Sequence, residues 1–286
     1  MLESAISTAD LNLLGRSWKD SLKVLYNLLL MEDAANAEEL IITCRGTVRA
    51  ARSGDPTQHE HWRVQELFRR WYASLERGDP DFGVYDSPWY LAEAYASWAI
   101  YSRPYLQLIQ NPIKMPPRGL VSHLGEVSTV VDLGCGIGFS TAVLSQLFPA
   151  ATVFGTNVPG SLQTRIACRV ADPSMTGEPS FHVVPGVDQI EAPVSLVFAS
   201  EYFEHFADPI GHLREVIRSI VPTSFLLANS FTSDAIGHFN TYPVDGEQVA
   251  GKRTAKAFAS ELRKHGYRRV KTKLWNKRPD YWTRVL

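Results

Sequence analysis

Three side chains that follow a predicted buried strand have the types and spacing of a metal-binding group. Glu201, Glu204 and His205 stand at positions i, i+3 and i+4, so a helical backbone would place them on one face. Two carboxylates and an imidazole are ligands suited to Mg, Mn, Fe or Zn. An imidazole that titrates near neutral pH also accepts protons, so His205 and the later His238 are candidates for a general base. Tyr202 is a candidate for orienting a substrate.

A glycine-rich turn upstream has the composition of an anion-binding loop. Asp132 ends an apolar run and is followed by Gly134, Gly136 and Gly138, after which a helical pattern begins. Glycine lets the backbone approach a ligand closely, and a helix N-terminus presents N–H groups to an anion. The dinucleotide fingerprint requires a third glycine three residues after its second, and neither alignment of this turn supplies it. The Gly-Lys-Ser/Thr of a P-loop is missing from the turn as well.

The remaining pattern, Asp-Leu-Gly-x-Gly-x-Gly at 132–138, resembles the first motif of the class I S-adenosylmethionine (SAM)-dependent methyltransferases. The resemblance covers about residues 120–286. It implies that the turn, Cys135 included, cradles the methionine end of SAM. It also implies that Asp132 helps to hold the turn and the amino group of the cofactor.

The same resemblance implies further cofactor contacts at the ends of the next strands. The family usually places an acidic residue after its second strand to bind both ribose hydroxyls, but this chain has Asn157, followed by Val158. An amide binds a hydroxyl without the help of a charge, which weakens the hydrogen bond. Val187 and Asp188 match the place that contacts adenine, although Asp188 also fits a surface turn. Glu201 is a further predicted cofactor contact.

The Glu-x-x-Glu-His pattern resembles a segment of metal-dependent O-methyltransferases. Examples are the small-RNA 3′-terminal 2′-O-methyltransferases and the ubiquinone-pathway O-methyltransferases. In the RNA enzymes a further histidine follows the next strand, where this chain has His238. The implied ligands are Glu201, Glu204, His205 and His238. Other class I methyltransferases have a Glu-His pair but use no metal, and there Glu204 and His205 would bond the local backbone instead. Both alternatives stay open at this point.

The resemblance implies an enzyme, a SAM-dependent methyltransferase. The preferred reaction is O-methylation of a hydroxyl on a small molecule, a sugar or a nucleotide, with a divalent cation as an optional assistant. One alternative is a nucleic-acid methyltransferase that acts on a 2′-hydroxyl or a base. The sequence lacks the Asn/Asp-Pro-Pro-Tyr/Phe and Pro-Cys motifs of DNA-base methyltransferases, which makes DNA bases less favoured. The other alternative is a non-catalytic SAM-binding accessory subunit, which Asn157 supports.

The elements that must position these residues alternate from residue 126 onward. Strand patterns and helix patterns follow one another with short connections, which is typical of a doubly wound α/β fold. We expect a mostly parallel seven-stranded sheet, a Rossmann-like methyltransferase fold, closed by a hairpin. Residues 229–251 are expected to form a long loop at the acceptor pocket. The expected strands are 127–132, 152–156, 181–184, 194–199 and 224–228, the hairpin strands are 267–275 and 281–286, and the helices are 138–147, 161–170, 209–220 and 254–265.

The first part of the chain has helical periodicity and a dense aromatic segment. We expect a helical domain over 1–118, which caps the active site and sets acceptor specificity or dimerisation, and a SAM-binding domain over 119–286. Residues 82–105 hold 8 of the 31 aromatic side chains. This segment fits a helix packed on the main domain, or a lid over a ligand. In the lid interpretation Tyr101 and Arg103 contact the cofactor, because Arg103 is available to a carboxylate or phosphate.

The net charge of −1 conceals a basic C-terminal segment. Residues 251–286 carry 12 basic and 2 acidic side chains, interleaved with Tyr267, Trp275, Tyr281 and Trp282. Basic and aromatic side chains together bind nucleic acid in many proteins. Lysine and arginine also protect the edge of a sheet from pairing with other chains, and we favour this interpretation.

Composition excludes several classes of protein. Hydrophobic residues make up 45% of the chain, and no apolar run approaches the roughly 18 residues of a membrane span. The N-terminus has no basic segment with a cleavage site, and three cysteines do not form a disulfide framework. We therefore expect a cytoplasmic protein without membrane contact, a small-molecule or nucleotide-type acceptor, and a homodimer as a further prediction.

Overall fold

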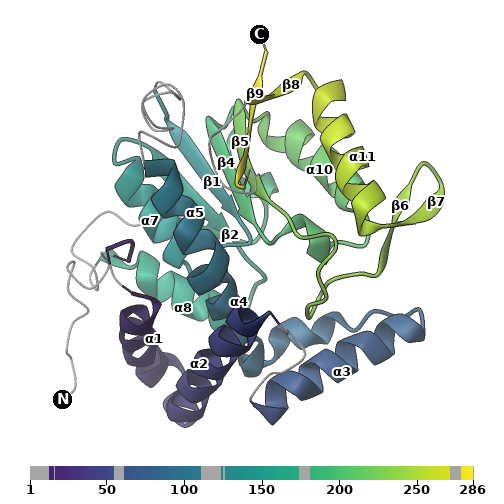
Figure 1. Cartoon of the computed structure of the whole chain (residues 1–286). Helices are drawn as coiled ribbons and strands as arrows, with labels where there is room; N and C mark the ends of the chain where they lie inside the picture. Colours follow the sequence, from purple (N-terminus) through teal and green to yellow (C-terminus); the bar gives the residue numbers. More distant parts are fainter. Residues whose placement is uncertain are drawn as a thin grey trace.

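The computed structural model describes residues 13–15, 17–54, 61–110, 124, 126–173, 181–270 and 278–285. At its centre is a seven-stranded sheet in the order β3-β2-β1-β4-β5-β9-β8 (Figure 1). The strands β1 to β5 pair in parallel, and β9 pairs antiparallel with both β5 and β8. The predicted doubly wound sheet with its closing hairpin is confirmed. The strands are β1 (Thr129–Leu133), β2 (Thr152–Thr156), β3 (His182–Val184), β4 (Leu196–Ser200), β5 (Ser224–Ala228), β8 (Tyr267–Val270) and β9 (Asp280–Arg284).

Successive side chains of the central strands belong to two separate apolar cores. In β4, Leu196 and Phe198 face one core, and Val197 and Ala199 face the other. This follows from the period of two in a strand, and burial on both faces explains why the central strands are mostly apolar. Helices therefore cover both faces, as a doubly wound fold requires (Figure 1). The helices of the second core are α10 (Pro209–Ile220) and α11 (Gly251–Lys264).

The first core is covered by the helices next to the glycine turn together with the helices of the N-terminal region. The former are α7 (Phe139–Leu147) and α8 (Leu162–Ala171). The latter are α1 (Trp18–Glu32), α2 (Ala37–Ser53), α3 (Trp62–Glu76), α4 (Leu91–Ser97) and α5 (Arg103–Gln110). Between α3 and α5 lie three short helical segments: η2 (Phe82–Asp86), η3 (Pro88–Tyr90) and the π-helical η4 (Trp98–Ser102).

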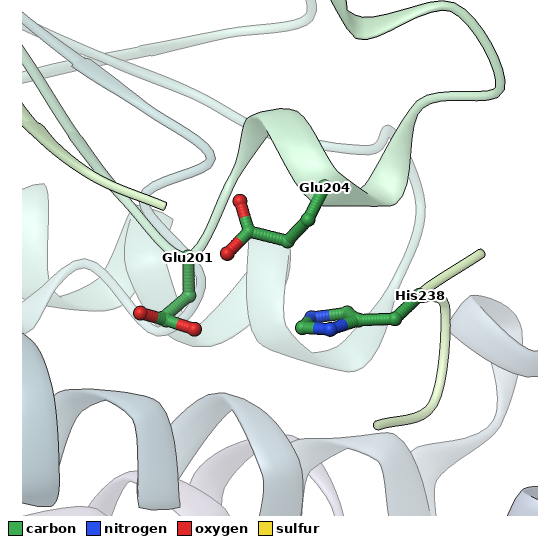
Figure 2. A group of neighbouring side chains, drawn as sticks. All are labelled: Glu201, Glu204 and His238. Carbon is green, nitrogen blue, oxygen red and sulfur yellow. The ribbon is translucent and has the colours of Figure 1, made fainter. Parts of the chain in front are cut away.

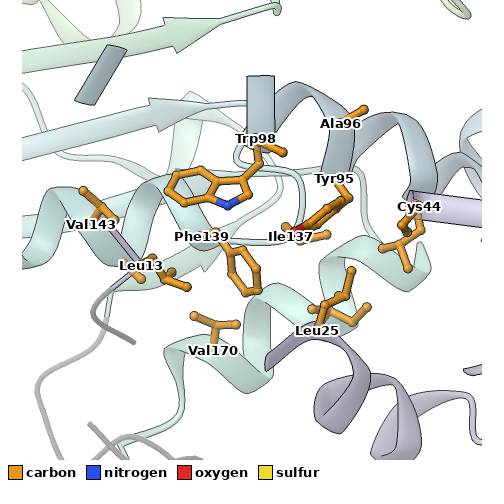
Figure 3. Close-up of a cluster of buried hydrophobic side chains, with 14 of the residues drawn as sticks. Leu13, Leu25, Cys44, Tyr95, Ala96, Trp98, Ile137, Phe139, Val143 and Val170 are labelled. Carbon is orange, nitrogen blue, oxygen red and sulfur yellow. The ribbon is translucent and has the colours of Figure 1, made fainter. Parts of the chain in front are cut away.

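The N-terminal helices and the sheet region share one core (Figure 3). Trp98 of η4 lies edge-on to Phe139 of α7, with ring centroids 5.8 Å apart. Leu25 of α1 and Val170 of α8 are buried in the same cluster. The helical region is therefore packed on the face of the sheet that α7 and α8 cover. The predicted domain boundary at 118/119 lies outside the described residues, and the division into two domains stays a prediction.

The segment after β5 contains structure that the sequence analysis missed. Within 229–251, expected to be a long loop, β6 (Thr241–Val244) and β7 (Glu247–Ala250) form a two-stranded hairpin. Its two-residue turn is Asp245-Gly246, and both residues have positive φ. Asp-Gly is a strong signal for such a turn, so the hairpin was open to prediction.

The basic C-terminal segment forms the edge of the sheet. β8 is the outermost strand, and its Arg268 and Arg269 are exposed. Tyr267, Tyr281 and Trp282 are instead buried, so these three rings cannot stack on bases. The described part of the segment thus supports edge protection. Trp275, Lys271, Lys273 and Lys277 lie outside the described residues.

Among the described residues, no helix has the length and apolar character needed to cross a membrane. The cytoplasmic location and the homodimer stay predictions.

Candidate functional site

A cavity of about 1100 Å³ lies where the N-terminal helical region meets the carboxyl ends of the parallel strands. One wall comes from the segments that follow β1, β2, β3 and β4, and the opposite wall from α2, η2, α4 and η4. Open α/β sheets bind ligands at this edge. The volume exceeds the roughly 300–1,000 Å³ of an ordinary ligand pocket, so there is room for two small molecules.

Asp132, at the end of β1, is a buried carboxyl held by its own motif. One of its oxygens accepts hydrogen bonds from Ser140 Oγ at 2.6 Å and Thr141 Oγ1 at 2.7 Å. Burial raises the pKa of Asp132 to about 6, against the effect of these two hydrogen bonds. Because both hydroxyls belong to the first turn of α7, the carboxyl fixes the helix start beside the glycine turn.

The glycine turn has a backbone conformation that residues other than glycine rarely adopt. Gly134, Gly136 and Gly138 have φ of 68°, 54° and 78°, which favour glycine. A Cβ on Gly134 would lie 2.5 Å from the ring of Tyr202. A Cβ on Gly136 would meet only the Cβ of Ala94, at 3.6 Å. The turn lines the cavity and leaves space for a ligand against its backbone, which fits the predicted contact with SAM.

The end of β2 is tied to the same turn. Thr156 Oγ1 accepts a hydrogen bond from Gly134 N at 3.0 Å. Asn157 donates through Nδ2 to Gly136 O at 2.6 Å and accepts through Oδ1 from Val158 N at 3.0 Å. Asn157 therefore braces the turn from the position where the family usually has an acidic residue. Asn157 and Val158 both line the cavity, and their contact with the ribose stays a prediction.

The other predicted cofactor residues divide into two groups. Cys135, Val187, Asp188, Glu201 and Tyr101 all line the cavity. Arg103 is not among the described residues that line it. The predicted roles of all these residues on the cofactor stay predictions.

Glu201, Glu204 and His238 form a cluster at the end of β4 (Figure 2). One potential ligand atom from each lies within 4.8 Å of the other two. Glu204 is fully buried, and its Oε1 accepts a hydrogen bond from Ser230 N at 2.5 Å. Its Oε2 is buried without a hydrogen-bond partner. Burial and the neighbouring Glu204 hold the pKa of Glu201 well above its usual range. A proton or a cation between two neighbouring carboxyls relieves the repulsion between them.

The orientation of His238 leaves one ring nitrogen with a free lone pair. Nδ1 lies 2.9 Å from the carbonyl oxygen of Ser233, which can only accept a hydrogen bond. Neutral His238 therefore carries its proton on Nδ1, and Nε2 is available as a ligand or a base. Trp71 Nε1 donates to the carbonyl of His238 at 2.8 Å, so α3 fixes this backbone.

The helical backbone that would place His205 with the two glutamates does not form. Glu201 has a φ of 53°, in the left-handed region, and only a 3₁₀ turn, η6 (Phe203–His205), follows. His205 is not part of the cluster of possible ligands. Its Nδ1 lies 3.0 Å from Tyr85 Oη, and its ring is edge-on to His238 with centroids 4.6 Å apart. Burial, followed by the repulsion of His238, holds the pKa of His205 well below its usual range.

Tyr202 also occupies a position at the cavity wall. Its hydroxyl lies 2.9 Å from His212 Nε2, and its ring closes over Gly134. The geometry fits a residue that shapes the site, and its predicted role in orienting a substrate stays a prediction.

Several site residues escaped sequence reasoning. Ser230 bridges the two glutamates, because its N–H donates to Glu204 and its Oγ donates to Glu201 at 3.1 Å. No local signal marks Ser230. Glu93 lies in the aromatic segment 82–105, whose density was the available signal, and Tyr85 is one of the aromatic residues of that segment, for which a lid over a ligand was one prediction. Glu93 and Gln163 both line the cavity.

Comparisons with known proteins match the part of the chain that contains the glycine turn. Residues 131–228 match the family model described as "Methyltransferase domain". A trans-aconitate 2-methyltransferase of Azoarcus sp. is 32% identical over 112 residues, which are 36% of this chain and 39% of the relative. The chain thus aligns with about two fifths of that relative's length.

Two solved structures resemble the chain at 14% identity and a TM-score of 0.48. The mitomycin 7-O-methyltransferase MmcR is covered over 90% of its length and 96% of this chain. A putative O-methyltransferase from Nostoc punctiforme is covered over 68% of its length and 77% of this chain. The match places residues 131–228, with the glycine turn at the end of β1, in this methyltransferase domain family, as the resemblance to the class I SAM-dependent methyltransferases implied.

Proposed function

We propose that this chain transfers a methyl group from SAM to a hydroxyl of a small molecule bound in the cavity. The observation that carries this proposal is the cluster of Glu201, Glu204 and His238, of which Glu201 and His238 line the same cavity as the glycine turn. SAM, when bound, supplies the methyl group on its sulfonium. The chain has to bind both molecules, orient them and remove the hydroxyl proton.

The glycine turn would hold the methionine end of the cofactor. Asp132, Thr156 and Asn157 support this role, because each is hydrogen-bonded to the turn or to the helix that follows it. Cofactor contacts at Val187 and Asp188 rest on the family resemblance and on their place in the cavity wall.

A histidine at the cavity can take the proton that the hydroxyl of the methyl acceptor releases. His238 offers a lone pair on Nε2, because the Ser233 carbonyl holds the proton on Nδ1. His205 is neutral at pH 7, since its pKa is held well below its usual range. A neutral imidazole can take up a proton that a hydroxyl releases as it becomes a nucleophile. We place His238 first, because its nitrogen belongs to the carboxyl cluster.

The cluster also fits a divalent cation. Glu201, Glu204 and His238 would hold it, and the unpartnered Oε2 of Glu204 is the observation that favours it. Among Mg, Mn, Fe and Zn, a set of two carboxylates and one imidazole does not select one. A bound cation lowers the pKa of a coordinated hydroxyl.

A small-molecule acceptor is favoured over a nucleic acid. The N-terminal helices contribute a full wall of the cavity, which a small molecule fits better than a duplex. The described aromatic rings of the basic segment are buried and unavailable for stacking.

The test follows formation of S-adenosylhomocysteine (SAH) from SAM. The full chain is incubated with an ultrafiltered fraction of small metabolites and, separately, with the retained macromolecules. We expect SAH with the small molecules only, O-methylated products by mass spectrometry, and loss of turnover with EDTA that Mn²⁺ restores. Glu204→Gln should lose this metal response, whereas Glu247→Gln, a variant of the exposed hairpin, should keep it.

The contrary outcomes separate the alternatives. Turnover with the macromolecules alone would favour a nucleic-acid methyltransferase. Turnover that EDTA leaves unchanged would remove the cation from the proposal. SAH binding without turnover on either fraction would favour an accessory subunit.

A further inference from the structure

The ionisable side chains that line the cavity are mostly carboxyls. Seven carboxyl side chains and three histidines line the cavity. No lysine or arginine is among the described residues that line it. Arg278 donates to Ser230 Oγ at 3.0 Å, beside the carboxyl cluster, but is not one of the lining residues. A cavity lined by carboxyls attracts cations and repels anions. Four of the seven are exposed, namely Asp86, Asp188, Glu215 and Asp234.

The cofactor alone does not account for this excess. SAM carries a sulfonium, an ammonium and a carboxylate, and so one net positive charge. Asp132 belongs to the glycine turn, and Glu201 belongs to the carboxyl cluster. Glu93 belongs to neither. It lies on α4, and the next residue, Ala94, is the one that faces Gly136. Glu93 therefore lines the helical wall of the cavity, beside the residue that faces the glycine turn.

Glu93 is poised to meet a cation. Burial raises the pKa of Glu93 to about 7. A positive group beside it would favour the charged form and would be bound in return.

Gln163 is a second residue at the cavity that could bind a hydrogen-bond donor, and this observation is independent of Glu93. Its side chain is buried, and Nε2 donates to the carbonyl oxygen of Tyr85 at 3.3 Å. That bond fixes the orientation of the amide, and Oε1 is left buried at the cavity without a partner. A buried acceptor oxygen of this kind is normally satisfied by a donor, which a ligand N–H group can supply.

The rest of the same wall is aromatic. Tyr85, Tyr90, Trp98 and Tyr101 all line the cavity. Aromatic rings bind apolar bodies, and their faces also attract ammonium groups.

We propose that the acceptor is an amine-bearing molecule with a largely apolar body, and that Glu93 binds its ammonium group. The inference rests on the proposed methyl transfer and names the class of its acceptor. An anionic acceptor such as trans-aconitate, the compound in the name of the Azoarcus relative, would meet carboxyls here and no lining lysine or arginine.

The test uses three phenols that differ only in the charge at the end of the side chain. These are tyramine, the neutral 4-propylphenol and 3-(4-hydroxyphenyl)propionate. Each is titrated by calorimetry into the full chain saturated with SAH at neutral pH. We expect tyramine to bind about tenfold more tightly than the neutral phenol, and the carboxylate to bind most weakly.

Variants of Glu93 and Gln163 test whether these residues cause the preference for tyramine. Glu93→Gln should remove the advantage of tyramine while SAH affinity stays within a factor of about two. Gln163→Leu should weaken tyramine less, and Glu247→Gln should leave the order unchanged. Equal binding of the three phenols, preference for the carboxylate, or no tyramine binding at millimolar concentration would overturn the inference. Absence of SAH binding would overturn the proposed function as well, so the two failures are distinguishable.

Discussion

Asp132 and Glu204 are buried carboxyls at the ends of neighbouring strands, and they differ in how their oxygens are satisfied. Asp132 accepts hydrogen bonds from two hydroxyls that follow it within nine residues. Glu204 accepts one from Ser230, far along the chain, and its other oxygen has no partner. Asp132 is thus held by side chains of the helix that follows it, whereas Glu204 is held by a backbone group of a distant segment. The surroundings of Asp132 come from local sequence, and those of Glu204 come from segments far apart in the chain.

The largest expected effect concerns the buried charge of Asp132. Its pKa is raised from 3.8 to about 6, so the folded chain binds the proton more tightly than the unfolded chain. The stability that this group contributes is fully present below pH 3.8 and is lost as the pH rises through about 6. The loss is on the order of 3 kcal/mol.

Denaturant unfolding over this pH range measures the effect. Asp132→Asn should remove this part of the pH dependence. Ser140→Ala, which deletes one hydrogen bond to the carboxylate, should extend the decline to higher pH. Identical profiles for wild type and Asp132→Asn would contradict the buried charge.

A smaller effect is expected from the glycine turn. Gly134→Ala would drive a Cβ into the ring of Tyr202, so we expect SAH affinity to fall about a hundredfold. Gly246→Ala is the matched control, because this glycine also has a positive φ but nothing lies within 4 Å of its Cβ position. Calorimetry with SAH decides the matter, and equal affinities would show that the turn is not the cofactor site.

The contrast between the two carboxyls can be tested through stability. Thr141→Val deprives Asp132 of a donor and should lower the free energy of unfolding by about 2 kcal/mol. Glu204→Gln keeps the acceptor for Ser230 and removes repulsion with Glu201. In EDTA it should therefore leave the stability unchanged or raise it. If both variants lose the same stability, Glu204 is a structural carboxyl like Asp132.

The smallest effect is expected at the basic edge of the sheet. Arg268→Ala removes an exposed charge and should change stability by less than about 0.5 kcal/mol, with no change in cofactor binding. Arg214→Ala is the comparison, because Arg214 pairs at 2.6 Å with Glu261 and should cost about 1 kcal/mol. A large loss of turnover in Arg268→Ala would show that the edge takes part in binding.

The local parts of the site were the predictable ones. The strands 152–156 and 224–228 and the helix 209–220 have the bounds expected from their patterns. The period of side-chain burial within one element is a local signal, so it can be read from the sequence. The glycine turn followed from spacing alone. The unpartnered state of Glu204 depends on where Ser230 arrives, and no periodicity encodes that. The spacing of Glu201 and His205 suggested a helical face, but the left-handed backbone at Glu201 turns His205 toward Tyr85.

The most direct test of the central claim is a calorimetric titration of SAH into the full chain, with EDTA and then with Mn²⁺. We predict one saturable cofactor site per chain, bound both in EDTA and in Mn²⁺. Absence of SAH binding at millimolar concentration would contradict the assignment of the cavity to methyl transfer.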